Sequence, residues 1–81
     1  MPTAPITRQA LEDWLVERLT QDLNLEQEID VRRPFSYYGL DSVMAISLAA
    51  DLEDMLGREL EPTLLWDFPT IEALAAFLVA A

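Results

Sequence analysis

The strongest constraint on the fold is a helical repeat of apolar residues that occurs three times in a chain of 81 residues. The first stripe lies on one face of a helix that we expect to run from Arg8 to Leu19 or Leu23, with the Thr7 hydroxyl as its N-cap. Its apolar positions are Leu11, Trp14, Leu15 and Leu19. Nowhere do apolar and polar residues alternate as in a half-buried strand, so the pattern predicts an all-α fold.

The second helix should begin at Asp41 or Ser42, because Gly39 breaks the preceding chain and aspartate is a strong N-cap residue. Gly57 is the natural residue to end it. With about 100° of rotation per residue, one side of this helix carries the expected core positions, which are Ala45, Leu48, Leu52, Met55 and Leu56.

The last third of the chain predicts one short and one longer helix. Pro62 and Pro69 leave room between them for a short helix only, within residues 63–68. Thr70 then caps a helix whose apolar positions are Ile71, Leu74, Ala75 and Leu78. Three main helices and one short helix predict a small four-helix bundle. We expect residues 1–81 to form a single domain, with a flexible start at residues 1–6.

A long connection separates the first two main helices. Residues 24–40 show no sustained period, and the segment is longer than most connections in compact domains. We therefore expect it to be an ordered loop, pinned across the helices by its own apolar residues. The candidates are Leu25, Ile29, Val31, Phe35 and Leu40. Among the aromatic residues, Trp14, Phe35 and Phe77 are expected in the core, and Trp66 is undecided.

The charged residues narrow the classes of function. Fifteen acidic residues face five arginines, with no lysine or histidine, for a net charge of -10. This charge disfavours nucleic acid and anionic membrane surfaces as partners. It favours salt-sensitive encounters with proteins that carry basic patches. No apolar run approaches the roughly 20 residues that span a bilayer, so we expect a cytoplasmic protein, most simply a monomer.

The residue types that are missing exclude much chemistry. Without cysteine there is no disulfide framework and no thiolate nucleophile. Without histidine as well, the imidazole and thiolate ligands that zinc and copper usually take are missing, and we expect no metal site. A serine could not be activated by an imidazole, and no lysine could form a Schiff base. The sequence therefore predicts a protein that is not itself an enzyme.

The segment from Tyr38 to Val43 is the most informative in the chain. It places Ser42 in the first turn of a helix, directly after a bend at Gly39. Unpaired N–H groups and the positive end of the helix dipole would favour a phosphate esterified to this serine, although the charge of Asp41 partly offsets the effect. The residues alone leave a second reading open, in which Asp41 and Ser42 are simple capping residues.

This segment resembles the phosphopantetheine attachment motif of acyl carrier proteins, which stands here as Gly39, Leu40, Asp41 and Ser42. The similarity extends over most of the chain and is greatest to carrier domains of modular polyketide synthases. The accompanying residues are Ile29, Asp30, Pro34, Phe35, Leu52, Glu53, Leu56, Gly57, Pro62, Thr63, Leu64, Trp66, Asp67, Phe68, Pro69, Thr70 and Ile71.

The resemblance implies that Ser42 receives a covalent 4'-phosphopantetheine arm from coenzyme A through a separate, Mg-dependent phosphopantetheinyl transferase. The thiol of the arm would hold acyl or polyketide intermediates as thioesters. A ketosynthase, an acyltransferase or an acyl-activating ligase, and other biosynthetic enzymes would be the partners. Two alternatives remain open within the carrier class, a fatty-acid carrier and a peptidyl carrier. An unmodified acidic helical adaptor is the alternative outside it.

Partner proteins are expected to contact the second main helix beside the arm. The apolar candidates are Val43, Met44 and Ile46, and the charged candidates are Asp51, Glu53 and Asp54. The alternative reading is that Val43 and Ile46 cover the long loop and that the acidic residues form an ordinary solvated face.

Overall fold

The computed structural model describes residues 6–61 and 63–80. Its elements are α1 (Arg8–Asp22), a 3₁₀ turn η1 (Phe35–Tyr38), α2 (Ser42–Leu56), α3 (Leu64–Asp67) and α4 (Ile71–Ala80). Apart from a single bridge between Pro34 and Thr70, these residues contain no strand. The all-α prediction is confirmed. The expected flexible start lies, except for Ile6, outside the described residues.

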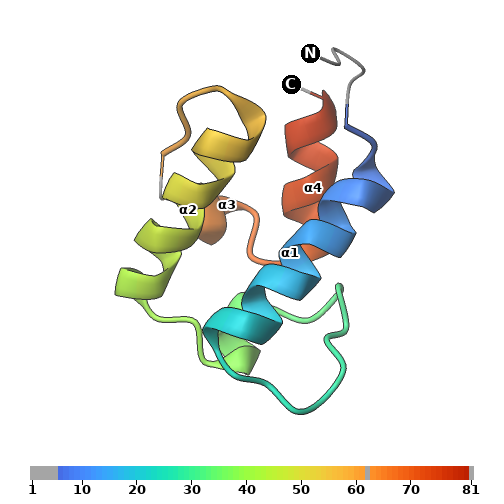
Figure 1. The fold of residues 1–81 in the computed structure, drawn as a ribbon, viewed down its shortest axis with the longest axis vertical. Helices are drawn as coiled ribbons and strands as arrows, with labels where there is room; N and C mark the ends of the chain where they lie inside the picture. The colour runs from blue at the N-terminus through green and yellow to red at the C-terminus, as the bar shows by residue number, and fades with distance from the viewer. Residues whose placement is uncertain (1–5, 62, 81) are drawn as a thin grey trace.

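Helices α1 and α4 lie side by side and form the most extensive contact between elements (Figure 1). Helix α2 stands across from this pair, with the short α3 between them, and the long loop after α1 closes the end at which α2 begins. The first turn of α1 and the last turn of α4 lie at the other end. No helix of residues 6–61 and 63–80 is both long and apolar enough to cross a membrane.

The helix ends follow the capping signals in the sequence. The Thr7 hydroxyl accepts a hydrogen bond from the Ala10 amide at 3.0 Å, which closes the start of α1. The Thr70 hydroxyl does the same for the Ala73 amide at 3.1 Å at the start of α4. Helix α2 ends at Gly57, which adopts the left-handed conformation with φ 70°. The predicted bounds of the helices are therefore confirmed to within a few residues.

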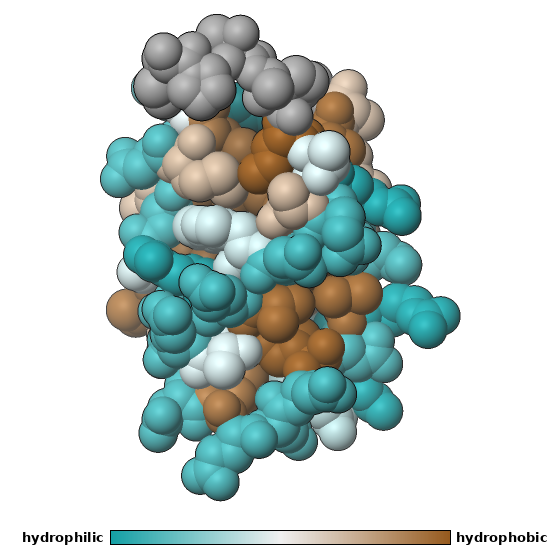
Figure 2. Space-filling model, turned by 45° about the vertical axis from the view of Figure 1, so that its right-hand side comes forward, coloured by the Kyte–Doolittle hydropathy of each residue, from teal (hydrophilic) through white to brown (hydrophobic). Residues whose placement is uncertain are grey.

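The core is built almost entirely from the predicted stripes. Its largest fully buried side chains are Leu11, Leu15, Leu19, Leu48, Leu52, Leu65, Ile71 and Leu74. Helix α2 differs from the prediction in detail, because Ala49 is buried while Met55 and Leu56 are only partly buried against the core. The helix thus turns its core face slightly away at its C-terminal end. In the view of Figure 2, hydrophobic surface is limited to patches framed by hydrophilic residues.

The loop after α1 is held mainly by backbone hydrogen bonds to the start of α4, which the sequence did not predict. The Phe35 amide donates to the Pro69 carbonyl at 2.7 Å, and the Glu72 amide donates to the Val31 carbonyl at 3.0 Å. Residues 35–38 form the turn η1, closed by local bonds such as that from the Gly39 amide to the Ser36 carbonyl at 3.1 Å, where only irregular loop was expected. Phe35 is buried as predicted.

The other predicted anchors of this loop differ in depth. Leu40 is buried, and Ile29 and Val31 pack partly buried against the core. Leu25 is half-buried, but it lines a surface groove between α1 and the loop and is not part of the core cluster. The loop is therefore anchored chiefly in its second half, next to the start of α2.

Candidate functional site

Ser42 is the first residue of α2, and its side chain is exposed. The preceding residue, Asp41, caps the helix: its Oδ1 accepts a hydrogen bond from the Met44 amide at 2.9 Å. The Asp41 carbonyl accepts a bond from the Ala45 amide, also at 2.9 Å. The capping role is thus carried by Asp41, and it leaves the Ser42 hydroxyl available for another purpose.

The serine is positioned by a tight turn directly before it. Gly39 ends η1 with φ 89° and ψ 17°, a left-handed conformation that residues with a side chain seldom adopt. Nothing lies within 4 Å of where its Cβ would be, so the backbone conformation alone favours glycine. Leu40 follows and is buried, which ties the turn to the core. The turn therefore holds Ser42 at a defined place while keeping it outside.

Two shallow grooves adjoin Ser42, and Trp66 of α3 lines both of them. The larger has a volume of about 430 Å³ and is lined by Phe35, Ser36, Leu40, Ser42, Leu65, Trp66 and Pro69. The smaller, of about 170 Å³, is lined by Ser42, Ala45, Ile46, Thr63 and Trp66. Trp66 is 55% exposed, although it is a large aromatic residue. The sequence left its role undecided, since no local spacing indicates that α3 packs beside the start of α2.

The predicted contact residues of α2 separate into two groups. Val43 is 73% exposed and Ile46 is 57% exposed, and Asp54 is exposed two turns further along the same face. Met44 is half-buried and packs against the core. Val43 and Ile46 therefore do not cover the long loop, which was the alternative reading.

The other two acidic residues predicted to contact partners are engaged within the chain. Asp51 Oδ2 accepts hydrogen bonds from Arg18 Nη2 at 2.7 Å and from Arg18 Nε at 3.1 Å, which links α1 to α2. The hydrogen bond that Arg18 donates to Asp51 raises the pKa of Arg18. Glu53 Oε2 accepts a hydrogen bond from the Leu60 amide at 2.8 Å. Both carboxylates thus have structural partners.

The aromatic residues expected in the core differ in how deeply they are buried. Phe35 is buried and Trp14 is half-buried, with the Arg18 guanidinium 5.7 Å from its ring centroid. Phe77 is not a core residue, since it is 37% exposed. It stacks on Phe68, with ring centroids 4.4 Å apart. It lies on the flank of α4, one position before the buried Leu78, so the expectation for this residue was wrong.

The arrangement around Ser42 suits a modification site better than a catalytic centre. A nucleophilic serine needs a base beside it, and the whole sequence has no histidine, lysine or cysteine. The helix start instead provides amide N–H groups without intrahelical acceptors and the positive end of the dipole of a 15-residue helix. An anionic group on the Ser42 oxygen fits this environment, beside the apolar lining of the two grooves.

Comparison with known proteins agrees with this geometry. Residues 13–78 match the family described as "Phosphopantetheine attachment site". Among curated proteins, one component of the phenolphthiocerol/phthiocerol polyketide synthase of Mycobacterium tuberculosis is 38% identical over 72 residues, which are 88% of this chain. The chain spans only 4% of the length of that relative.

Solved structures of carrier proteins share the fold. A free-standing peptidyl carrier protein from a secondary metabolic pathway of Acinetobacter baumannii is 44% identical, with a TM-score of 0.86 over 91% of this chain and 94% of that one. The acyl carrier protein LipD of Actinoplanes friuliensis is 49% identical, with a TM-score of 0.73 over 91% of this chain and 83% of that one.

Proposed function

Since this chain belongs to the family of phosphopantetheine attachment sites, we propose that Ser42 is the residue that carries the 4'-phosphopantetheine arm. The chain is a carrier and not an enzyme, as its family and fold indicate. The observation that supports the assignment to Ser42 is that two neighbouring residues have separate roles at the start of α2. Asp41 supplies the helix cap, and the neighbouring hydroxyl stays exposed between two grooves.

The start of α2 stabilises the phosphodiester that this modification creates. Amide N–H groups of the first turn and the helix dipole favour an anion there by about 0.3–1 kcal/mol at an exposed site. The carboxylate of Asp41 opposes this effect, but the Met44 amide at 2.9 Å neutralises part of its charge. Asp41 therefore sets the direction of the helix start at a modest electrostatic cost.

The attachment reaction balances without a base from this chain. The Ser42 oxygen forms a new bond to the phosphorus of coenzyme A that carries the pantetheine. The bond from that phosphorus to the adenosine bisphosphate breaks, and the transferase takes up the serine proton. The absence of histidine and lysine from the carrier therefore does not hinder the step.

The arm, when attached, supplies a thiol that holds an acyl group as a thioester. The chain's own residues determine how the base of the arm leaves the protein. Leu65 and Pro69 contribute apolar lining to the larger groove at Ser42, Ile46 contributes it to the smaller one, and Trp66 lines both. The chain has no cysteine, so its own side chains cannot take the acyl group by thiol exchange.

The cargo that we propose is an acyl or polyketide chain. Similarity to polyketide synthases of Mycobacterium tuberculosis, Bacillus subtilis and Pyricularia oryzae supports this class. A peptidyl cargo is the second candidate, and it is favoured by the 44% identity to a free-standing peptidyl carrier protein. The motif before the serine reads Gly39, Leu40, Asp41, which lacks the second glycine typical of peptidyl carriers.

The partners that we propose are a phosphopantetheinyl transferase and the enzymes that load and use the thioester. We expect them to contact the exposed face formed by Val43, Ile46 and Asp54, together with Trp66. The net charge of -10 would steer basic partner surfaces toward the carrier. We further propose that residues 1–81 act as one carrier domain, monomeric and located in the cytoplasm.

Intact-mass measurement tests the attachment site. The protein is incubated with coenzyme A, Mg²⁺ and a broad-specificity phosphopantetheinyl transferase. The parent protein should gain the mass of one phosphopantetheinyl group, and the Ser42→Ala variant should gain none. Ser36→Ala and Ser47→Ala are matched controls that should load like the parent, since Ser36 lies in η1 and Ser47 is in the middle of α2. Full loading of Ser42→Ala would overturn the assignment.

A further inference from the structure

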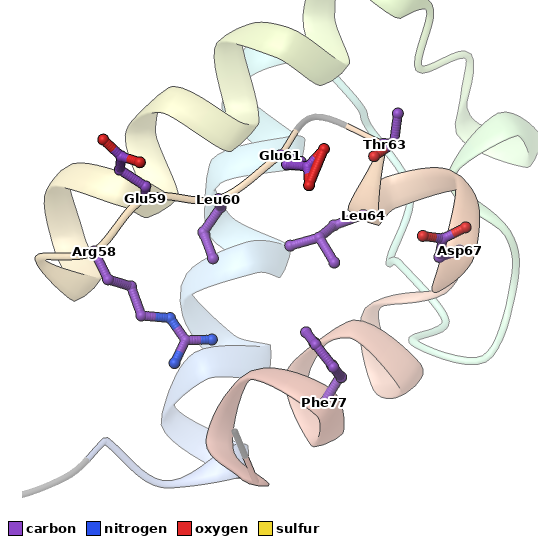
Figure 3. A pocket seen from close by; sticks show the side chains of 8 residues that line it. All are labelled: Arg58, Glu59, Leu60, Glu61, Thr63, Leu64, Asp67 and Phe77. Atoms are coloured by element: carbon purple, nitrogen blue, oxygen red, sulfur yellow. The ribbon is translucent and has the colours of Figure 1, made fainter.

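A further groove lies at the opposite end of α2 from Ser42. It has a volume of about 460 Å³ and is lined by Arg58, Glu59, Leu60, Glu61, Thr63, Leu64, Asp67 and Phe77. Figure 3 shows the side chains of Leu60, Leu64 and Phe77 pointing toward one space from three different elements. They form an apolar floor, and the exposure of Phe77 results from this arrangement.

The groove is preformed by a defined chain reversal after α2. Gly57 adopts φ 70°, and its amide and that of Arg58 both donate to the Glu53 carbonyl, at 2.8 and 3.2 Å. The Glu53 side chain then accepts the Leu60 amide at 2.8 Å. This pair of contacts holds Leu60 in place beside α3. Stacking of Phe77 on Phe68 fixes the opposite wall.

The rim of the groove is acidic. Glu59, Glu61 and Asp67 are exposed, and against them stands one cation, Arg58, so the lining has a net charge of -2. Within residues 6–61 and 63–80 the ion pairs are Arg8–Glu12 and Arg18–Asp51, so the rim carboxylates are not neutralised by a pair of their own. The negative end of the α2 dipole points to the same side and adds to the attraction for cations.

We propose that this groove is a docking site for a basic segment of a partner protein, which inserts one aliphatic or aromatic side chain between flanking arginines or lysines. The apolar floor would take the inserted side chain, and Glu61 and Asp67 would meet the flanking cations. Arg58 lies at the other end of the groove from Asp67 in Figure 3, so the cations of the segment would be held on the side of Glu61 and Asp67.

The charge complementarity selects this occupant over others. Nucleic acid and anionic lipid carry phosphates, which an acidic rim repels. A second copy of this chain carries a net charge of -10 and would have to approach against repulsion. Of the eight lining residues, Thr63 alone also borders a groove at Ser42, so occupation here would leave the hydroxyl of Ser42 accessible.

A peptide titration followed by amide chemical shifts tests the proposal. The probe is a short synthetic peptide with two leucines four positions apart and arginines on both sides of each. Its matched control has glutamates in place of the arginines. We expect the basic peptide to give saturable shifts at Leu60, Leu64 and Phe77, and the acidic peptide to give none.

Matched variants separate this groove from general charge attraction. Glu61→Lys with Asp67→Lys should weaken binding of the basic peptide by about tenfold or more. Glu26→Lys with Glu28→Lys makes the same change in net charge at the groove lined by Leu25 and should leave binding close to that of the parent. Phe77→Ala should weaken binding of the basic peptide because it removes part of the apolar floor of the groove. A preserved amide spectrum elsewhere would show that the fold is intact.

The outcomes that overturn the proposal are distinct. Equal losses in the two double-lysine variants would mean that only total charge counts. Shifts spread along α1, or no saturable shift, would exclude a docking site, and concentration-dependent shifts of the protein alone would assign the groove to a second copy. The Ser42→Ala variant should bind the peptide like the parent, so failure here is distinguishable from failure of the attachment proposal.

Discussion

The two ends of α2 are shaped by the same local features, a left-handed glycine and a carboxylate that accepts a backbone amide. They differ in the sign of the helix dipole. Each end adjoins a glycine in the left-handed conformation, Gly39 with φ 89° and Gly57 with φ 70°. At each end a carboxylate holds a backbone amide: Asp41 holds that of Met44 at 2.9 Å and Glu53 that of Leu60 at 2.8 Å. The positive end of the helix presents a hydroxyl that suits a phosphate, and the negative end presents an acidic groove.

The difference between the two ends shows which polar side chains remain available for modification or for contact with a partner. At the start of α2 the capping carboxylate leaves its neighbour Ser42 exposed. At the end of α2, Glu53 is itself used to shape the loop, whereas its neighbour Asp54, and Glu59 and Glu61 further along, are exposed. Counting acidic residues on α2 is therefore a poor guide to its contact surface, because Asp51 and Glu53 are already engaged.

Disrupting the shared core of α2 should damage both ends at once and gives the largest expected effect. Leu48 and Leu52 lie one turn apart and are 0% and 1% exposed. Leu48→Ala or Leu52→Ala should lower the free energy of unfolding by about 2–5 kcal/mol. Thermal and denaturant unfolding measure this loss. Truncation of the exposed Val43 to alanine is the control, and a similar loss there would show that the core face of α2 is misassigned.

Replacing each glycine by alanine should separate the two ends. Both Gly39→Ala and Gly57→Ala place a side chain at positive φ and should cost about 1–2 kcal/mol of stability. The expected difference is functional: Gly39→Ala should slow loading of Ser42, and Gly57→Ala should weaken binding of the basic peptide. Unfolding curves, loading rates and peptide titration of both variants measure this. If each variant impaired both functions equally, the two ends would not be independent.

At Asp41 and Glu53, whose carboxylates accept hydrogen bonds from backbone amides, substitution by alanine should lower stability more than substitution by the corresponding amide. Asp41→Ala should cost about 0.5–2 kcal/mol, as for loss of an N-cap, whereas Asp41→Asn keeps an acceptor and should cost less. Glu53→Ala should likewise destabilise the loop after α2 more than Glu53→Gln does. Amide exchange at Met44 and at Leu60 reports each bond directly. Unchanged protection at both amides in the alanine variants would contradict these assignments.

Charge and apolar substitutions on the exposed face of α2 should act on association and not on folding. Val43→Asp and Asp54→Lys should each slow loading by the transferase about threefold or more at low salt. Glu17→Lys on α1 is the matched control and should change the rate little, since Glu17 is exposed on another helix. Stopped-flow loading at several salt concentrations measures the effect. A loss of the same size in the control would remove the proposed contact face.

The smallest effect is expected from the ion pair that ties α1 to α2. Arg18→Met removes the bonds to Asp51, but both side chains are partly exposed, so stability should fall only slightly and less still at high salt. Because the folded-state pKa of Arg18 is raised, its contribution should persist throughout the neutral range. A steep pH dependence of unfolding between about pH 6 and about 9 that disappears in this variant would contradict this reading.

The helices were predictable from sequence because their signals are local. Thr7, Asp41 and Thr70 mark helix starts, and each forms the hydrogen bond that its position predicts. The proposed attachment site at Ser42 could be predicted for the same reason, since the motif around it is contiguous. The turn η1 was missed, because residues 24–40 show no sustained period and the bond from the Phe35 amide to the Pro69 carbonyl, which anchors the start of the turn, joins residues far apart in the chain.

Features that depend on packing between distant elements could not be read from spacing alone. Trp66 reaches the surroundings of Ser42 only because α3 packs beside the start of α2. Phe77 was expected in the core because it lies at helical spacing, yet the buried face of α4 passes through Leu74 and Leu78. Both aromatic residues became candidate contact residues only once the fold was known.

Locating the modified residue in the loaded protein tests the central claim most directly. After loading with coenzyme A and transferase, the protein is digested and its peptides are fragmented in a mass spectrometer. The account predicts one phosphopantetheinyl group per chain, on Ser42. A group on Ser36 or Ser47, or no modification of a folded protein by an active transferase, would contradict it.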